Sequence, residues 1–158
     1  MTPLSHWIRS TGLHEFMVQN QLAFTACETL HFMGLTVLAG ALLVIDLRGL
    51  GFYKRMPLLE LHKLVPFAIG AFIVNLLTGI CFIASDPDHY FIDLSFKVKM
   101  VLILVAGVNA LVFEFLVFRP MKAGVPGVEQ QAVTKITSGL SIFLWAGVLI
   151  CGRLIPYV

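Results

Sequence analysis

Hydrophobic residues occur in four long blocks along the chain, separated by segments rich in polar residues, glycine and proline. The blocks cover about residues 22–47, 64–84, 96–118 and 136–155. Each approaches or exceeds the ~20 residues that a helix needs to cross the hydrocarbon core of a bilayer. A segment in lipid must satisfy its backbone hydrogen bonds internally, so each block is expected to be helical. The pattern predicts an all-α integral membrane protein, a bundle of four transmembrane helices.

Residues 1–20 precede the first block and show a different pattern. Trp7 and Phe16 fall near one face of a helix, and Arg9 suits the lipid headgroup layer. The segment lacks the continuous apolar stretch of a secretory signal peptide. We therefore expect a short N-terminal interfacial helix and a single membrane domain over residues 1–158.

Composition supports this class of protein. Hydrophobic residues make up 58% of the chain and charged residues only 13%, with a mean hydropathy of +0.90. A soluble domain carries about 25% charged residues, so most of this surface is expected to face the lipid bilayer. The formal net charge of +2 is too small to indicate a nucleic-acid partner.

Basic residues are divided unevenly between the two ends of the predicted bundle. Seven of the 11 lysines and arginines lie at or near the first and third connections: Arg48, Lys54, Arg55, Lys63, Arg119, Lys122 and Lys135. Connections on the cytoplasmic side of a membrane carry an excess of such residues. The first and third connections are therefore expected inside the cell and both termini outside.

Ionisable residues inside a membrane span are functional candidates, and here they form two layers. In the outer layer, Glu28 and His31 are three residues apart and share a helix face. Lys97 and Lys99 open the third block, and His89 lies in the loop before it. A b-type haem with His31 as its metal ligand, a lysine near the propionates and His89 among the candidate second ligands fits this layer. The alternative is a structural contact of His31 with Glu28 or a neighbouring helix.

Two other metal centres are disfavoured by spacing. A haem held by His31 and His62 is excluded because His31 lies roughly 25 Å along the helix axis from Arg48, near which His62 is expected. A di-iron site built on the Glu28 and His31 pair needs further glutamates, and Glu114 lies in the other layer.

Three cysteines lie near the outer ends of their predicted helices. Cys27, Cys81 and Cys151, with His31 and nearby methionines, would suit Cu(I). Small apolar packing residues are the favoured interpretation, so copper is the less favoured cofactor.

The inner layer is interpreted as structural, clamping the inner ends of the helices together. Its members are Asp46, Arg48, His62 and Glu114. Asp46 is expected to pair with Lys63, His62 or Arg119, and Arg48 with Glu114 or a lipid phosphate.

Asn75 and Asn109 come out at similar depth near the middle of the second and third blocks. A hydrogen bond between them is the expected structural role. Trp145 lies too deep for an interfacial anchor, which indicates a packing or cofactor-facing ring.

Several motifs resemble, in order, those of a family of small four-helix bacterial inner-membrane proteins classed as a domain of unknown function. They are Ser5-His-Trp-Ile-Arg-Ser10, Glu28-x-x-His31-x-x-Gly34, Asp46-Leu-Arg48-Gly-Leu-Gly51, Leu77-Thr-Gly79 and Phe96-Lys-x-Lys99 with Asn109. The resemblance implies a multi-pass protein of the bacterial inner membrane, with periplasmic termini in the orientation above. A looser likeness, carried by Phe96, Lys99 and His31, is to copper-resistance and cytochrome-b-like membrane bundles, which bind haem or handle copper.

Two functions remain open at this stage. One is a single-haem redox protein, or a haem- or copper-handling bundle, with its site on His31 and a quinone and a periplasmic protein as redox partners. The other is a non-catalytic accessory or scaffold subunit. Glycine-rich helices favour a homo-oligomer or a place in a larger membrane complex. Motifs for nucleotide binding or nucleophilic catalysis are lacking, so no enzymatic activity is assigned.

Overall fold

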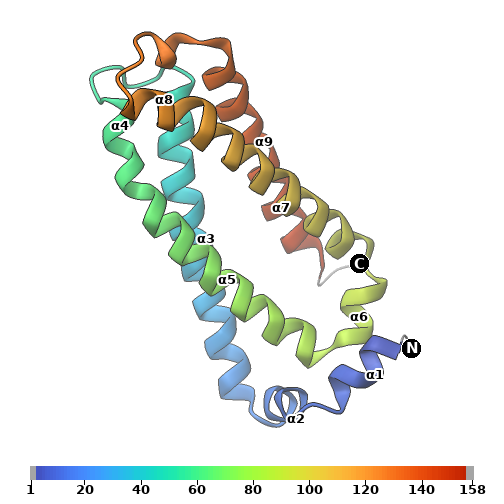
Figure 1. Cartoon of the computed structure of the whole chain (residues 1–158). Helices are drawn as coiled ribbons and strands as arrows, with labels where there is room; N and C mark the ends of the chain where they lie inside the picture. Colours follow the sequence, from blue (N-terminus) through green and yellow to red (C-terminus); the bar gives the residue numbers. More distant parts are fainter. Residues whose placement is uncertain (1–2, 156–158) are drawn as a thin grey trace.

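The computed structural model describes residues 3–155, with side chains from Ser5 onward, and every regular element in that range is helical (Figure 1). Four helical rods are long and apolar enough to cross a membrane. They are Gln21–Gly49, Leu58–Ser85, Leu94–Lys122 and Ala132–Leu154. The predicted fold class, a four-helix membrane bundle, is confirmed.

Each rod begins before the apolar block that predicted it. The first is α3 (Gln21–Gly49), which begins where the Asn20 side chain accepts a hydrogen bond from the backbone of Ala23 at 3.2 Å. The second begins six residues before its block, because α4 (Leu58–Leu61) and η1 (His62–Leu64) lead without a break into α5 (Val65–Ser85).

The third rod changes its helical type along its length. It consists of α7 (Leu94–Phe113), the π-helical turn η2 (Glu114–Phe118) and α8 (Arg119–Lys122). The connection that follows contains the short 3₁₀ helix η3 (Val128–Gln130) and leads into α9 (Ala132–Leu154). π-helical turns inside α-helices are frequent at functional sites, which draws attention to this part of the bundle.

The four rods pack as two antiparallel pairs. α3 packs along α5, α7 packs along α9, and contacts between α3 and α9 join the pairs. In Figure 1 the pairs lie close together at one end and diverge towards the other. The end where the pairs lie close together carries the connections at residues 50–57 and 123–131, and we call it the basic end. We call the opposite end the terminal end. Within residues 3–155, α5 and α7 are successive spans but make no extensive contact, so the bundle has a seam between them.

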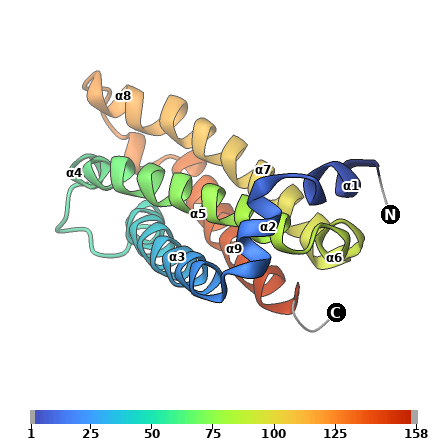
Figure 2. The same cartoon turned by 90° about the horizontal axis from the view of Figure 1, so that it is seen from below.

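Three short helices lie across the terminal end (Figure 2). They are α1 (Pro3–Arg9), α2 (Gly12–Gln19) and α6 (Pro87–Ile92). The N-terminal segment is helical as expected, but it divides in two where Thr11 caps α2.

Two contacts fix these short helices to each other and to the bundle. An ion pair of 2.8 Å between Arg9 and Asp88 ties α1 to α6, and His14 bonds to the main chain of Ala84 at 2.7 Å. The segment predicted to lie at the membrane interface therefore covers the terminal end of the bundle.

Candidate functional site

His31, on which the haem hypothesis rests, faces α5 from α3. Its Nδ1 lies 2.8 Å from the Thr78 hydroxyl, and its ring packs on Phe82 with the ring centres 5.1 Å apart. Because the Thr78 hydroxyl donates its own hydrogen to the carbonyl of Val74 at 2.8 Å, it accepts the Nδ1 proton of His31. In the neutral ring Nε2 then carries a lone pair, and no described residue hydrogen-bonds to it.

The other candidate residues of this layer lie in separate environments. Glu28 is exposed on α3, and Lys97 is exposed and donates to a carbonyl of α6 at 3.3 Å. Lys99 is half-buried against a glycine of α9, and the His89 ring bonds to the carbonyl at the end of α9 at 3.2 Å. Among the described residues, no group of three or more His, Cys, Asp and Glu is placed to hold a metal ion. His31 therefore has its structural contact with α5, and the contact with Glu28 is not made.

The predicted hydrogen bond between Asn75 and Asn109 is wrong. Asn109 is buried and donates to the main chain of Thr137 on α9 at 3.0 Å. Asn75 faces Gly34 on α3, and both polar atoms of its side chain lack a partner among the described residues. The two asparagines cannot meet because their helices, α5 and α7, stand on opposite sides of the seam.

At the basic end, Arg48 contacts both connections. It forms an ion pair of 2.5 Å with Glu129 and also donates to the carbonyl of Met56. The other oxygen of Glu129 accepts from the backbone of Leu58 at 3.2 Å. The predicted pairing of Arg48 with Glu114 is therefore wrong, because Glu114 contacts His62 and Lys122. Arg48 instead holds both connections to the start of the second span.

A second polar cluster occupies the side of the basic end nearest η2. His62 lies 3.1 Å from Glu114, and Lys122 lies 2.9 Å from His62 and 3.4 Å from Glu114. Arg119 stands apart from this cluster, with its guanidinium 4.2 Å from the centre of the Phe115 ring. The inner layer predicted from the sequence thus divides into separate groups.

Asp46 belongs to neither cluster. Its predicted partners are wrong, because Lys63 pairs with Glu60 on the surface, His62 binds Glu114 and Arg119 covers a phenylalanine. Asp46 is only 5% exposed, and it lines the same cavity as Ser141 of α9. Among the described residues it has no ion pair.

A cavity of about 570 Å³ lies inside the half of the bundle nearest the basic end. Its walls come from α3, η1, α5, α7, η2 and α9 and are mainly aliphatic and aromatic. The side chains that bring polar atoms to the lining are Asp46, His62, Asn109, Glu114, Ser141 and Trp145. Ile69 of α5 and Leu111 of α7 also line it, although they are 54% and 58% exposed on the surface. The cavity therefore reaches the outer surface of the bundle at the seam.

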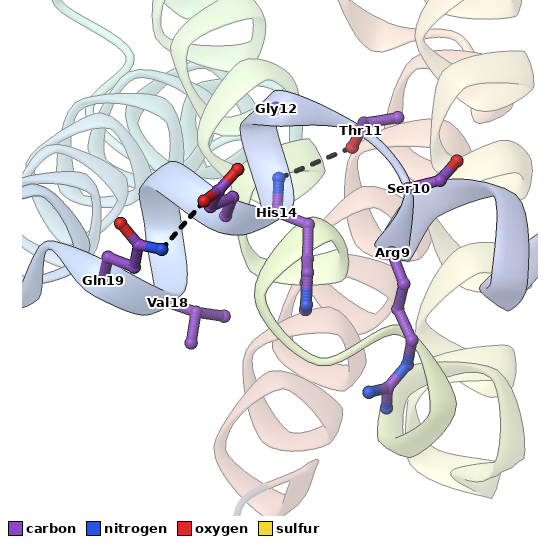
Figure 3. A pocket seen from close by; sticks show the side chains of 8 residues that line it. Arg9, Ser10, Thr11, Gly12, His14, Val18 and Gln19 are labelled. Atoms are coloured by element: carbon purple, nitrogen blue, oxygen red, sulfur yellow. Dashed lines mark hydrogen bonds between the residues drawn. The ribbon is translucent and has the colours of Figure 1, made fainter.

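A further hollow of about 330 Å³ lies on the surface at the terminal end (Figure 3). Its lining comes only from residues 9–19 at the corner between α1 and α2. The backbone of His14 donates there to the Thr11 hydroxyl, and Gln19 donates to Glu15 at 2.9 Å (Figure 3). This hollow is a crease between two short helices, and the candidate site is the cavity of the basic half.

Several lining residues of the cavity are predicted from the sequence as polar exceptions, but the cavity that they form together is not. The sequence predicts structural roles for the polar lining residues and a packing or cofactor-facing role for the ring of Trp145; the polar residues are Asp46, His62, Asn109 and Glu114. Their common cavity arises because α5 and α7 stay apart, and hydrophobic patterning does not reveal that. Hydrophobic patterning alone does not distinguish Ser141 from a serine that serves close helix packing. A serine one turn before Trp145 was the available signal of a polar lining on that helix.

The family of unknown function DUF6644 matches residues 17–158, and the chain therefore belongs to this family. No curated protein and no solved structure matches the chain. The looser likeness to copper-resistance and cytochrome-b-like bundles receives no support from these comparisons.

Proposed function

We propose that the protein binds an amphiphilic molecule dissolved in the membrane, in the cavity between α5 and α7. The observation that carries the proposal is a mainly apolar cavity with polar groups that reaches the lipid-facing surface at the seam. Its volume of about 570 Å³ falls within the ~300–1,000 Å³ of small-molecule sites in proteins.

The arrangement of the lining supports an amphiphile over a purely apolar ligand. Leu38, Phe72 and Ile103 would surround an apolar body. Asp46 and Ser141 would hydrogen-bond to a headgroup, which a polar side chain in an apolar site requires to offset its desolvation. Such a molecule would enter sideways from the bilayer, without crossing the connections at either end.

The test uses the fluorescence of Trp145, which lines the cavity. Trp7→Phe removes the other tryptophan, which is exposed on α1. In nanodiscs, a brominated alkyl alcohol is expected to quench Trp145 with a saturable dependence on concentration. In Ala106→Phe the larger side chain is expected to occupy the cavity and abolish the saturable quenching. Val108→Phe, on the exposed side of α7, is expected to leave the saturable quenching intact. Quenching that rises linearly in all three proteins would reject the proposal.

A second candidate function is the redox one, with a b-type haem on His31. It is favoured by the hydrogen bond from Nδ1 to Thr78, because metal-binding histidines are commonly oriented by such a bond from the other ring nitrogen. Lys97 and Lys99 would then neutralise the propionates. His89 would have to leave the carbonyl at the end of α9 to act as second ligand. A Soret band that disappears in His31→Ala would support this candidate, and a colourless protein after haem addition would reject it.

The accessory or scaffold role is the alternative to both. It would leave the cavity filled by lipid chains or by a helix of a partner, and neither probe would bind. We also propose the bacterial inner membrane as the location, with both termini in the periplasm, on the strength of the basic residues at the opposite end.

A further inference from the structure

We propose that the ligand of the cavity carries a positive charge, and that it competes with a proton for the carboxylate of Asp46. This inference rests on the proposed function of the cavity and names the chemical class of its ligand. The class is a hydrophobic monovalent organic cation, such as a quaternary ammonium ion or a protonated amine with an apolar body.

The position of Asp46 carries the inference. The residue is 5% exposed and lines the cavity together with Ser141 of α9. A carboxylate in an apolar site is strongly destabilised unless it is neutralised. Among the described residues no cation is paired with it, so a proton or a charged ligand must neutralise it.

The neighbouring basic residues are committed elsewhere. Arg48, two residues along α3, is held by Glu129 and the Met56 carbonyl. Lys63 pairs with Glu60, and the guanidinium of Arg119 lies over a phenylalanine ring. None of these can neutralise Asp46 without breaking an existing contact.

The other titratable groups that line the cavity are paired with one another. His62 and Glu114 line it from η1 and η2, and Lys122 of α8 binds both of them. From α9 the lining residues are Ser141 and Trp145, which do not titrate in this range. His62, Glu114 and Lys122 satisfy one another, which leaves Asp46 as the acidic group available to a ligand.

The remaining lining suits a cation. Trp145 and Phe72 bring aromatic rings to the cavity, and aromatic faces attract organic cations. When the ligand binds to the protonated protein, one proton leaves Asp46 as one cation takes its place, so the total charge of the site is unchanged. Protons and cations therefore bind in exchange.

The experiment compares three brominated probes that have the same alkyl chain and differ only in the headgroup: an alcohol, a trimethylammonium and a sulfonate. Binding is read from saturable quenching of Trp145 in the Trp7→Phe protein, in nanodiscs of zwitterionic lipid. At neutral pH the ammonium probe is expected to bind most tightly and the sulfonate most weakly. On acidification the affinity for the ammonium probe is expected to fall by up to about tenfold per pH unit, with little change for the alcohol.

Variants assign the charge preference to one side chain. Asp46→Asn is expected to remove the preference for the ammonium probe and the pH dependence of its affinity, while the alcohol probe still binds. Asp46→Glu is expected to keep both the preference and the pH dependence. Glu60→Gln removes a surface carboxylate at the same end and should change neither. His62→Gln removes the imidazole that lines the cavity with Asp46. The affinity for the ammonium probe is expected to keep its pH dependence in this variant. If Asp46→Asn fails to fold, the pH profile of the ammonium probe decides.

The outcomes separate the two proposals. Equal affinities of the three probes at every pH, or a cation preference that survives Asp46→Asn, would overturn the inference and leave the amphiphile site standing. Absence of saturable binding by any probe would overturn both.

Discussion

Single polar side chains hold the helices of this bundle at a few defined points. The Thr78 hydroxyl is one of them, because it accepts from His31 and donates within α5. We predict that Thr78→Val lowers the free energy of unfolding by about 0.5–1.5 kcal/mol, as expected for one hydrogen bond between helices. Thr36→Val is the matched control, since the exposed Thr36 hydroxyl bonds only within its own helix. Unfolding in mixed micelles measures both, and equal effects would contradict the assignment.

The ion pair of Arg48 and Glu129 is a second contact between single side chains that is expected to stabilise the protein. Arg48 is 8% exposed, so removing its counter-charge leaves a nearly buried cation. We predict that Glu129→Gln lowers the free energy of unfolding by about 1–3 kcal/mol. Glu60→Gln, which breaks the exposed pair with Lys63, should change it by less than about 1 kcal/mol. A neutral effect of Glu129→Gln would show that the pair does not hold the connections.

Gly49 limits how closely α3 and α9 approach at the scale of helical elements. A Cβ atom there would overlap the buried Ser138 hydroxyl, whereas a Cβ at Gly40 would meet open space. We predict that Gly49→Ala destabilises the protein by about 1–3 kcal/mol and that Gly40→Ala does not. Adding Ser138→Gly should recover part of the loss in Gly49→Ala. The absence of recovery in the double variant would place the strain elsewhere.

The contact between α1 and α6 depends on pH in a defined direction. Hydrogen bonds from Ser5 and Arg9, and the nearby positive charge, hold the pKa of Asp88 below its ordinary value of 3.8. The contact is therefore fully present above 3.8 and is lost as the pH falls through the lowered pKa. The protection of α1 amides against hydrogen exchange, corrected for the intrinsic rate at each pH, is expected to fall on acidification in the wild type. In Arg9→Gln the exchange should already be raised at neutral pH, and an unchanged rate there would contradict the role of the ion pair.

Hydrophobic patterning was sufficient to locate the four spans, because their length and composition alone distinguish them. It did not reveal the start of the second span at Leu58, since the polar residues Glu60, His62 and Lys63 interrupt the apolar run there. It also could not pair the asparagines correctly. Similar depth makes a contact available only if the two helices are neighbours, and which spans are neighbours is decided by packing across the whole bundle.

At the scale of the whole molecule, the same limit explains why the site was only partly predicted. The lining residues are polar exceptions in apolar helices, so Asp46, Asn109 and Glu114 could be selected from the sequence. The cavity itself depends on the separation of α5 from α7 and on the π-helical turn at Glu114–Phe118. Arg48 pairs with Glu129, which lies in the connection between the third and fourth spans. Hydrophobic patterning identifies that segment only as a connection and does not predict the pairing.

The orientation of the whole molecule in the membrane can be tested by cysteine labelling from each side. With the three native cysteines removed, a cysteine introduced at Val125 in the third connection is expected to react with a membrane-impermeant thiol reagent only after the inner face is exposed. A cysteine introduced at Ser10 is expected to react from the periplasm. Labelling of the Val125 position in intact cells would reverse the orientation proposed from the basic residues.

A ligand of the cavity between α5 and α7 should remain bound when the protein is extracted from its own membrane. Native mass spectrometry is expected to show a bound amphiphile of discrete mass in the wild type and in Val108→Phe, and to show its loss in Ala106→Phe. Protein of unchanged mass in all three, with no adduct, or an adduct that Ala106→Phe keeps, would contradict a binding site in the cavity between α5 and α7.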